Sequence, residues 1–175
     1  MSDRNVVLTG FMGTGKTTVG RVLADRLGRE FVDSDRMIEA RHGPIATIFA
    51  EQGEEAFRGY EREVANELAG RRRVVVATGG RMMLDAANAR TLGATGDVVC
   101  LVASLDTILE RVAVGDAGAT RPLLRGDDVR SRVADLLEER ADAYGAFDQI
   151  ETDGRTPDEV AMAIIEHIGV ERTDG

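Results

Sequence analysis

Apolar and polar positions follow two alternating periods along this chain of 175 residues. Short apolar runs rich in β-branched residues predict strands at 5–9, 30–32, 74–78, 98–102 and 148–151. Between them, apolar residues recur every three or four positions, which predicts helices at 16–27, 35–42, 44–51, 53–69, 84–91, 105–113, 127–144 and 157–168. Strands that alternate with helices are typical of a parallel sheet covered on both faces. The pattern predicts an α/β fold, and the length fits one domain over 1–175.

Residues that typically begin or end helices refine these boundaries. Gly28 is expected to stop the first helix, and Ser104 and Thr156 are expected to cap the helices that follow them. The segment at 113–126 combines small residues with Arg121 and a following proline, which predicts a mobile lid.

The loop between the first strand and the first helix carries the clearest chemical signal. It reads Gly-Phe-Met-Gly-Thr-Gly-Lys-Thr over 10–17 and matches the phosphate-binding pattern G-x-x-x-x-G-K-[ST]. Lys16 is the only lysine among the 22 lysine and arginine residues, and it stands where a slim ammonium must reach between phosphates. Backbone N–H groups and a helix N-terminus at this place stabilise an anion. The chain is therefore expected to bind a nucleoside triphosphate through Gly13, Thr14, Gly15, Lys16, Thr17 and Thr18.

Two acids follow the second predicted strand. The third strand ends in Thr78-Gly79-Gly80 and offers no metal-binding aspartate, so Asp33 and Asp35 are the candidates for that role. In an open parallel sheet both would face the phosphate loop, and a spacing of two in extended chain would point them the same way. The alternative interpretation is that Asp35 caps the next helix.

Composition limits the possible partners. The net charge of -9 argues against a nucleic-acid surface, and no segment approaches the ~20 apolar residues of a membrane span. The single cysteine, Cys100, lies in an apolar run and is expected to be a core residue. These features predict a cytoplasmic monomer that acts on small molecules.

Several motifs in order along the chain resemble the shikimate kinase family. They are the phosphate loop, Asp33-Ser34-Asp35, Gly53-Glu54, Phe57-Arg58, Glu61, Thr78-Gly79-Gly80, Arg121-Pro122-Leu123-Leu124, and Arg140 with Tyr144. The resemblance implies a P-loop kinase fold of three α/β/α layers. Its five-stranded parallel sheet would have the order 2-3-1-4-5, with a substrate-binding segment at about 33–62. The implied reaction is ATP-dependent phosphorylation of shikimate to shikimate 3-phosphate, in the chorismate pathway that leads to aromatic amino acids.

The same resemblance implies roles for individual residues. Lys16, Asp35 and Arg121 would be catalytic, and Asp35 would hydrogen-bond the acceptor hydroxyls. Thr17 would ligate Mg²⁺ directly, and Asp33 would hold it through water. The acceptor carboxylate would lie between Arg58 and Arg140, near the backbone N–H of Gly80, with Glu61 orienting Arg58. Arg121 would also reach the nucleotide, and Arg111 and Arg155 would flank adenine.

Some positions leave alternatives open. Arg58 and Glu61 could form a solvent-exposed helix pair, and Arg140 could belong to a solvated face. Arg81 stands where the family has a third glycine, and we expect it at the edge of the acceptor pocket, solvated or paired with an acid. Asp142 stands where the family usually has proline. A kinase of another small polyol acid such as gluconate, or a catalytically inactive nucleotide-binding regulatory domain, are the alternative functions.

Overall fold

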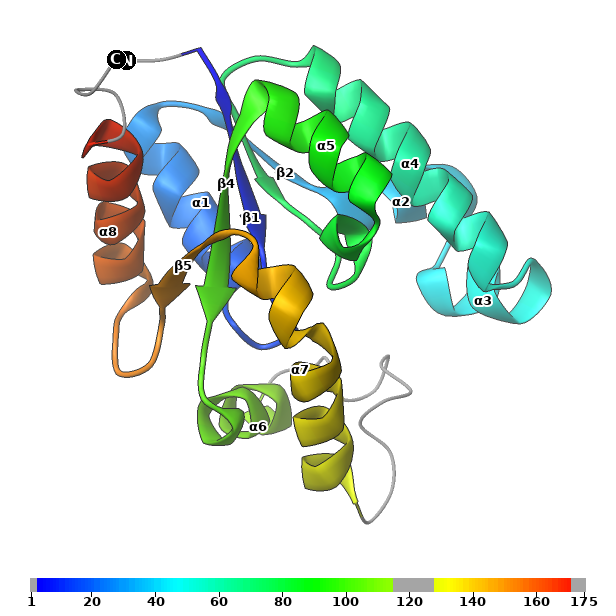
Figure 1. Cartoon of the computed structure of the whole chain (residues 1–175). Coiled ribbons are helices and arrows are strands. Elements are labelled where there is room, and N and C mark those ends of the chain that lie inside the picture. Colours follow the sequence, from blue (N-terminus) through cyan, green and yellow to red (C-terminus); the bar gives the residue numbers. More distant parts are fainter. Residues whose placement is uncertain (1–2, 115–127, 171–175) are drawn as a thin grey trace.

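The computed structural model describes residues 3–114 and 128–170 (Figure 1). Arg121 and most of the predicted lid lie outside these residues. The strands are β1 (Asn5–Thr9), β2 (Glu30–Asp33), β3 (Val74–Ala77), β4 (Gly96–Val102) and β5 (Asp148–Glu151). The helices are α1 (Lys16–Leu27), α2 (Ser34–His42), α3 (Ile45–Glu51), α4 (Glu54–Gly70), α5 (Ala86–Thr95), α6 (Leu105–Val114), α7 (Val129–Gly145) and α8 (Pro157–Val170). A short 3₁₀ turn, η1 (Met82–Leu84), precedes α5.

The five strands form one parallel sheet in the order β2-β3-β1-β4-β5, which confirms the predicted fold class. The central strand β1 pairs with β3 on one edge and with β4 on the other. Val7 lies opposite Val76 of β3 and opposite Val98 of β4. All five residues of β1 are buried, as expected for a strand that has neighbours on both edges and helices on both faces.

Helices cover the two faces of the sheet in separate groups (Figure 1). Val6 and Leu8 point to the face where α1 and α8 pack, and their core includes Leu23 and Ile164. Val7 points to the opposite face, where its core is shared with α2, α4 and α5. This alternation follows from the strand period of two, and it explains why the strands read as continuous apolar runs.

Helix α6 and much of α7 lie beyond the carboxyl end of β4 (Figure 1). A third core cluster joins them to the phosphate loop through Phe11, Cys100, Ile108, Val133 and Tyr144. Cys100 is fully buried there, so its predicted core position is confirmed. The cluster fixes α7 next to the loop that follows β1.

Most predicted boundaries agree with the structure to within two residues. Gly28 ends α1 in the left-handed conformation at φ 59°, and the hydroxyl of Thr156 accepts a hydrogen bond from the backbone N–H of Glu159 at 3.2 Å. The Ser104 hydroxyl accepts one from the backbone N–H of Thr107 at 3.3 Å, so all three predicted helix ends are confirmed. The predicted helix at 84–91 was misplaced. Asp85 accepts the N–H of Ala87 at 2.8 Å and caps α5, which therefore begins two residues later than predicted, at Ala86, and ends four residues later, at Thr95.

Candidate active site

The phosphate loop connects β1 to α1 in a conformation that only glycine allows at its ends. Gly10 has φ +130°, and a Cβ there would lie 2.3 Å from the carbonyl oxygen of Leu101. Gly15 has φ +96° and directly precedes α1. Thr14 is buried and donates a hydrogen bond to the Phe11 carbonyl at 2.7 Å. The loop is thus held by its own residues and by β4, and it places the N-terminus of α1 where phosphates would bind.

Lys16 is the first residue of α1. Its ammonium donates to the carbonyl oxygens of Gly10 and Phe11, at 2.7 and 2.9 Å. The flexible side chain therefore lies along the phosphate loop. Rotation of its stem would let the ammonium exchange both carbonyl oxygens for oxygens of a bound phosphate.

Thr17 and Asp33 come together from α1 and β2. The Thr17 hydroxyl donates to a carboxylate oxygen of Asp33 at 3.2 Å. The other oxygen of Asp33 accepts the backbone N–H groups of Asp35 and Arg36, at 3.0 and 3.2 Å. Asp33, not Asp35, is therefore the N-cap of α2, and the alternative proposed for Asp35 was wrong. Because α2 begins at Ser34, the two acids do not lie in extended chain as expected, and Asp35 sits in the first helical turn.

Asp35 faces the segment that follows β3. A Cβ on Gly79 would lie 2.5 Å from a carboxylate oxygen of Asp35, so a side chain at this position would require Asp35 to shift. The buried hydroxyl of Ser34 accepts the backbone N–H of Gly79 at 2.9 Å. The role of Ser34 was missed by sequence reasoning, because it depends on the pairing of β2 with β3. Together these contacts fix Asp35 against the Gly79-Gly80 backbone.

Arg58 and Glu61 form an ion pair on α4 at 2.7 Å. The Glu61 side chain is 2% exposed and that of Arg58 is 21% exposed, so the alternative of a solvent-exposed pair was wrong. Burial raises the pKa of Glu61, and the Arg58 guanidinium opposes that rise only in part. The pair therefore orients Arg58 at the expense of desolvating a carboxylate.

Arg140 reaches the same region from α7. It is 7% exposed, so it does not belong to a solvated face, and its guanidinium lies 5.3 Å from the ring centroid of Phe11. One turn later, the Tyr144 hydroxyl donates a short hydrogen bond to the carbonyl oxygen of Gly80. Arg140 forms no ion pair with an acid within the described residues, and its buried Nε has no hydrogen-bond partner there. A buried cation of this kind favours an anionic ligand.

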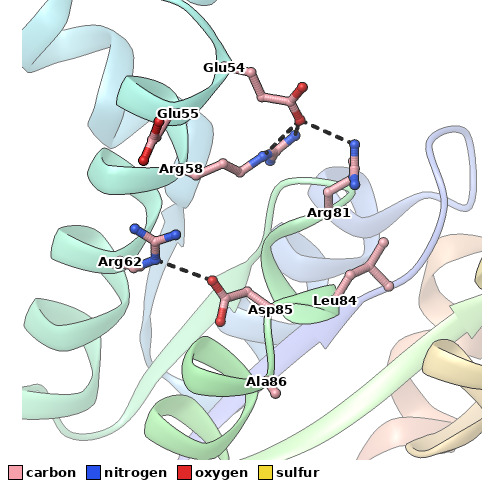
Figure 2. Close-up of a pocket in the computed structure, with 8 residues that line it drawn as sticks. All are labelled: Glu54, Glu55, Arg58, Arg62, Arg81, Leu84, Asp85 and Ala86. Atoms are coloured by element: carbon pink, nitrogen blue, oxygen red, sulfur yellow. Dashed lines mark hydrogen bonds and ion pairs between the residues drawn. The ribbon is translucent and has the colours of Figure 1, made fainter.

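An open cavity of about 590 Å³ adjoins Arg58, between α4 and the start of α5 (Figure 2). It is lined by Glu54, Glu55, Arg58, Arg62, Arg81, Leu84, Asp85 and Ala86. Arg81 is 48% exposed and pairs with Glu54 at 3.2 Å, which confirms that it is paired with an acid. Its backbone, at φ −113° and ψ −4°, lies outside the left-handed region that favours glycine. The sequence analysis named Glu54 within a motif but predicted no partner for it, although its spacing of four from Arg58 is a helix-pair signal.

The predicted adenine end of the site is held by Arg111. Its guanidinium donates to the Gly13 carbonyl at 3.2 Å and to the hydroxyl and carbonyl oxygens of Thr152, at 2.9 and 3.0 Å. It thus ties the phosphate loop to the segment after β5, where Arg155 is exposed. Thr18 is exposed on the first turn of α1.

Two further features bear on the kinds of ligand. Within the described ranges, no three His, Cys, Asp or Glu side chains are grouped to hold a metal ion. A Mg²⁺ ion that takes most ligands from phosphates and water does not need such a group. None of the helices in residues 3–114 and 128–170 has the length and apolar character to cross a membrane.

The chain is similar to known proteins over almost its whole length. A family model described as shikimate kinase matches residues 12–169. The shikimate kinase of Symbiobacterium thermophilum is 44% identical over 167 residues, which cover 94% of this chain and 95% of the relative. The solved structure of shikimate kinase from Acinetobacter baumannii in complex with shikimate has a TM-score of 0.90 and 38% identity, over 98% of this chain and 96% of that one. A gluconokinase from Sinorhizobium meliloti, at 20% identity and a TM-score of 0.63, shares the fold alone.

The buried Glu61 predicts a specific pH dependence of stability. Its folded pKa is raised above the ordinary 4.5, so the native state keeps the proton longer than the unfolded chain does. As pH rises from 4.5 through the folded pKa, wild type should lose stability relative to Glu61→Gln. Glu67→Gln is the control, and its stability difference from wild type should change with pH in the opposite direction. Hydrogen bonds from Arg41 and Arg71 lower the pKa of Glu67. Urea unfolding at several pH values would measure both differences, and a flat difference for Glu61 would contradict the assignment.

Gly79→Ala should displace Asp35, because the new methyl group would meet its carboxylate at 2.5 Å. We expect turnover to fall by about ten- to a hundredfold, since small displacements of reacting groups have effects of this size. Gly59→Ala is the matched control on α4, where a Cβ meets nothing within 4 Å. It should leave turnover unchanged and stabilise the fold by up to about 1 kcal/mol. Equal turnover in the two variants would show that Gly79 does not position Asp35.

Proposed function

The chain belongs to the shikimate kinase family, and from that premise we propose that it transfers the γ-phosphoryl group of ATP to the 3-hydroxyl of shikimate. The observation that carries the proposal is the buried Arg140, which has no acidic partner within the described residues. Tyr144, one turn after Arg140 on α7, donates a hydrogen bond to the Gly80 carbonyl, and Gly79 beside it faces Asp35. On this basis we place Arg58, Asp35 and the Gly80 backbone with Arg140 in one acceptor site. Two guanidinium groups suit the carboxylate of the acceptor, and a carboxylate suits its hydroxyls.

In the proposed reaction, Asp35 orients the acceptor hydroxyl and takes its proton. The hydroxyl oxygen forms a bond to the γ-phosphorus as the bond from that phosphorus to the β,γ-bridging oxygen breaks, and ADP leaves. Lys16 and the backbone N–H groups of Gly13 and Gly15 neutralise charge on the phosphates. Arg121, outside the described residues, is proposed to reach the transferring group.

We propose Mg²⁺ as the metal that accompanies ATP. The Thr17 hydroxyl would ligate it directly, and Asp33 would hold one of its water ligands, which is supported by their 3.2 Å contact. When bound, the ion would neutralise phosphate charge and align the γ-phosphate. Arg111 and Arg155 are proposed to flank the adenine ring. A monomeric state and a cytoplasmic location stay predictions.

A coupled assay of ADP release with a panel of acceptors tests the acceptor most directly. We expect turnover with shikimate and background rates with gluconate. Gluconate as the better acceptor would favour the kinase of another polyol acid. Absence of ADP release with every acceptor, in a chain that still binds ATP, would favour a regulatory nucleotide-binding domain.

Lys16→Ala should abolish phosphoryl transfer, because no second lysine exists in the chain. Lys16→Arg is the matched variant that keeps the charge. It should also be inactive, because the wider guanidinium fits poorly between phosphates. Circular dichroism would verify that both variants fold. Activity within tenfold of wild type in either variant would refute the proposed role of the ammonium.

Asp35 and Asp33 should give different phenotypes. Asp35→Asn should lower turnover by orders of magnitude and weaken shikimate binding, with ATP affinity little changed, because its partner is the acceptor. Asp33→Asn should raise the Mg²⁺ concentration needed for half-maximal activity, because its partner is a metal-bound water. Titrations of shikimate, ATP and Mg²⁺ separate the two. Identical profiles would contradict this division of roles.

A further inference from the structure

Glu54 occupies the edge of Arg58 that a carboxylate ligand would use. One oxygen of Glu54 accepts from Nε and Nη2 of Arg58, at 3.3 and 3.0 Å. The Nη1 group donates to Glu61 at 2.7 Å, so the opposite end of the guanidinium is already committed to a buried acid. An arginine binds a carboxylate best through two parallel N–H donors, and the Nε/Nη2 edge is such a pair. Without a ligand, Glu54 therefore holds the place of an acceptor carboxylate.

The same Glu54 oxygen also accepts from Nη1 of Arg81 at 3.2 Å (Figure 2). Figure 2 shows the Glu54 carboxylate at the centre of a chain from Arg58 to Arg81. Arg81 follows Gly80 directly and forms an ion pair with no second acid within the described residues. The other cation of the cavity, Arg62, is paired with Asp85 at 3.3 Å.

We propose that Glu54 is a built-in competitor for the acceptor carboxylate, and that Arg81 takes up Glu54 when the acceptor binds. The inference rests on the proposed function, since it requires a carboxylated acceptor at Arg58. In this exchange the acceptor replaces Glu54 on the Nε/Nη2 edge, and Glu54 stays bound to Arg81 alone. Arg81 thus acts as a positioning residue for Glu54 and sets acceptor affinity without touching the acceptor.

The geometry favours an exchange. Glu54 uses one oxygen for both bonds to Arg58, whereas an acceptor carboxylate can use two. The side chains of Glu54 and Arg81 are 54% and 48% exposed, so neither is fixed by packing. Arg58 is held by the buried Glu61, so it keeps its position when Glu54 leaves. Without Arg81, a displaced Glu54 would be left without its cation beside the incoming carboxylate.

Calorimetric titration of shikimate into the full chain, with no nucleotide present, tests the exchange. Glu54→Gln should tighten shikimate binding and Arg81→Ala should weaken it, each by about three- to fivefold, the range of exposed ion pairs. In the double variant, Arg81→Ala should have no further effect, because its partner is absent. Arg81→Lys should restore wild-type affinity. The KM for shikimate should follow these changes in both directions, which a merely structural role for Glu54 would not produce.

Two variants on the same cavity control for charge alone. Glu55→Gln removes an acid that makes no ion pair within the described residues, and Arg62→Ala removes a cation paired elsewhere. Both should leave shikimate affinity within about 1.5-fold of wild type, since their charges are exposed and screened.

Three outcomes would overturn the inference. Weaker binding in Glu54→Gln would mean that Glu54 orients Arg58 and does not compete. An equal loss from Arg81→Ala with and without Glu54 would place Arg81 on the acceptor itself. A wild-type chain that binds no shikimate would overturn the proposed function and the inference together, and is thereby distinguished from the first two.

Discussion

The pairing of β1 with both β3 and β4 brings the phosphate loop next to the segment that follows β3. Thr78 donates its backbone N–H and its hydroxyl to the carbonyl of Leu8, each at 3.0 Å, so the end of β3 is fixed to β1. On the other edge, Gly10 approaches the carbonyl of Leu101 too closely for any side chain. The phosphate loop and the Gly79-Gly80 segment are therefore neighbours because two strands are in register with a third. A shift of that register would separate the proposed phosphate and acceptor sites.

An acidic protein can still bind two anionic substrates, because charges more than about 10 Å away are largely screened while those in the site are not. The net charge is -9, yet the site collects Lys16, Arg58 and Arg140. The surroundings of Arg58 and Arg140 differ in whether an acid of the chain already neutralises the guanidinium. Arg58 is oriented by a buried acid, whereas Arg140 lies over an aromatic ring with its Nε free of any partner within the described residues. The guanidinium of Arg58 is preorganised, and that of Arg140 is the one we propose to be neutralised by the ligand.

Local patterns were sufficient to predict the elements, since strand and helix periods and capping residues act over a few positions. The identity of the α2 cap could not be read from them. Asp33 and Asp35 are equivalent by spacing, and only the end of β2 at Asp33 decides between them. The burial of Arg140 was also invisible locally, because three acids stand close to it in sequence. It is buried because Phe11 and Tyr144 bring α7 onto the phosphate loop, a contact between distant parts of the chain.

The segment Gly79-Gly80-Arg81 shows that a glycine run can meet several separate requirements. Gly79 is limited by space, since a methyl group there would collide with Asp35. At Gly80 a Cβ would meet nothing within 4 Å, so any need for glycine there comes from the approach of a ligand to the backbone. Arg81 has ordinary backbone angles and pairs with Glu54, so neither strain nor an unpaired charge opposes a long side chain. A long side chain at the third position is therefore compatible with the fold of this chain, because Glu54 on α4 pairs with it, and through Glu54 it is linked to Arg58.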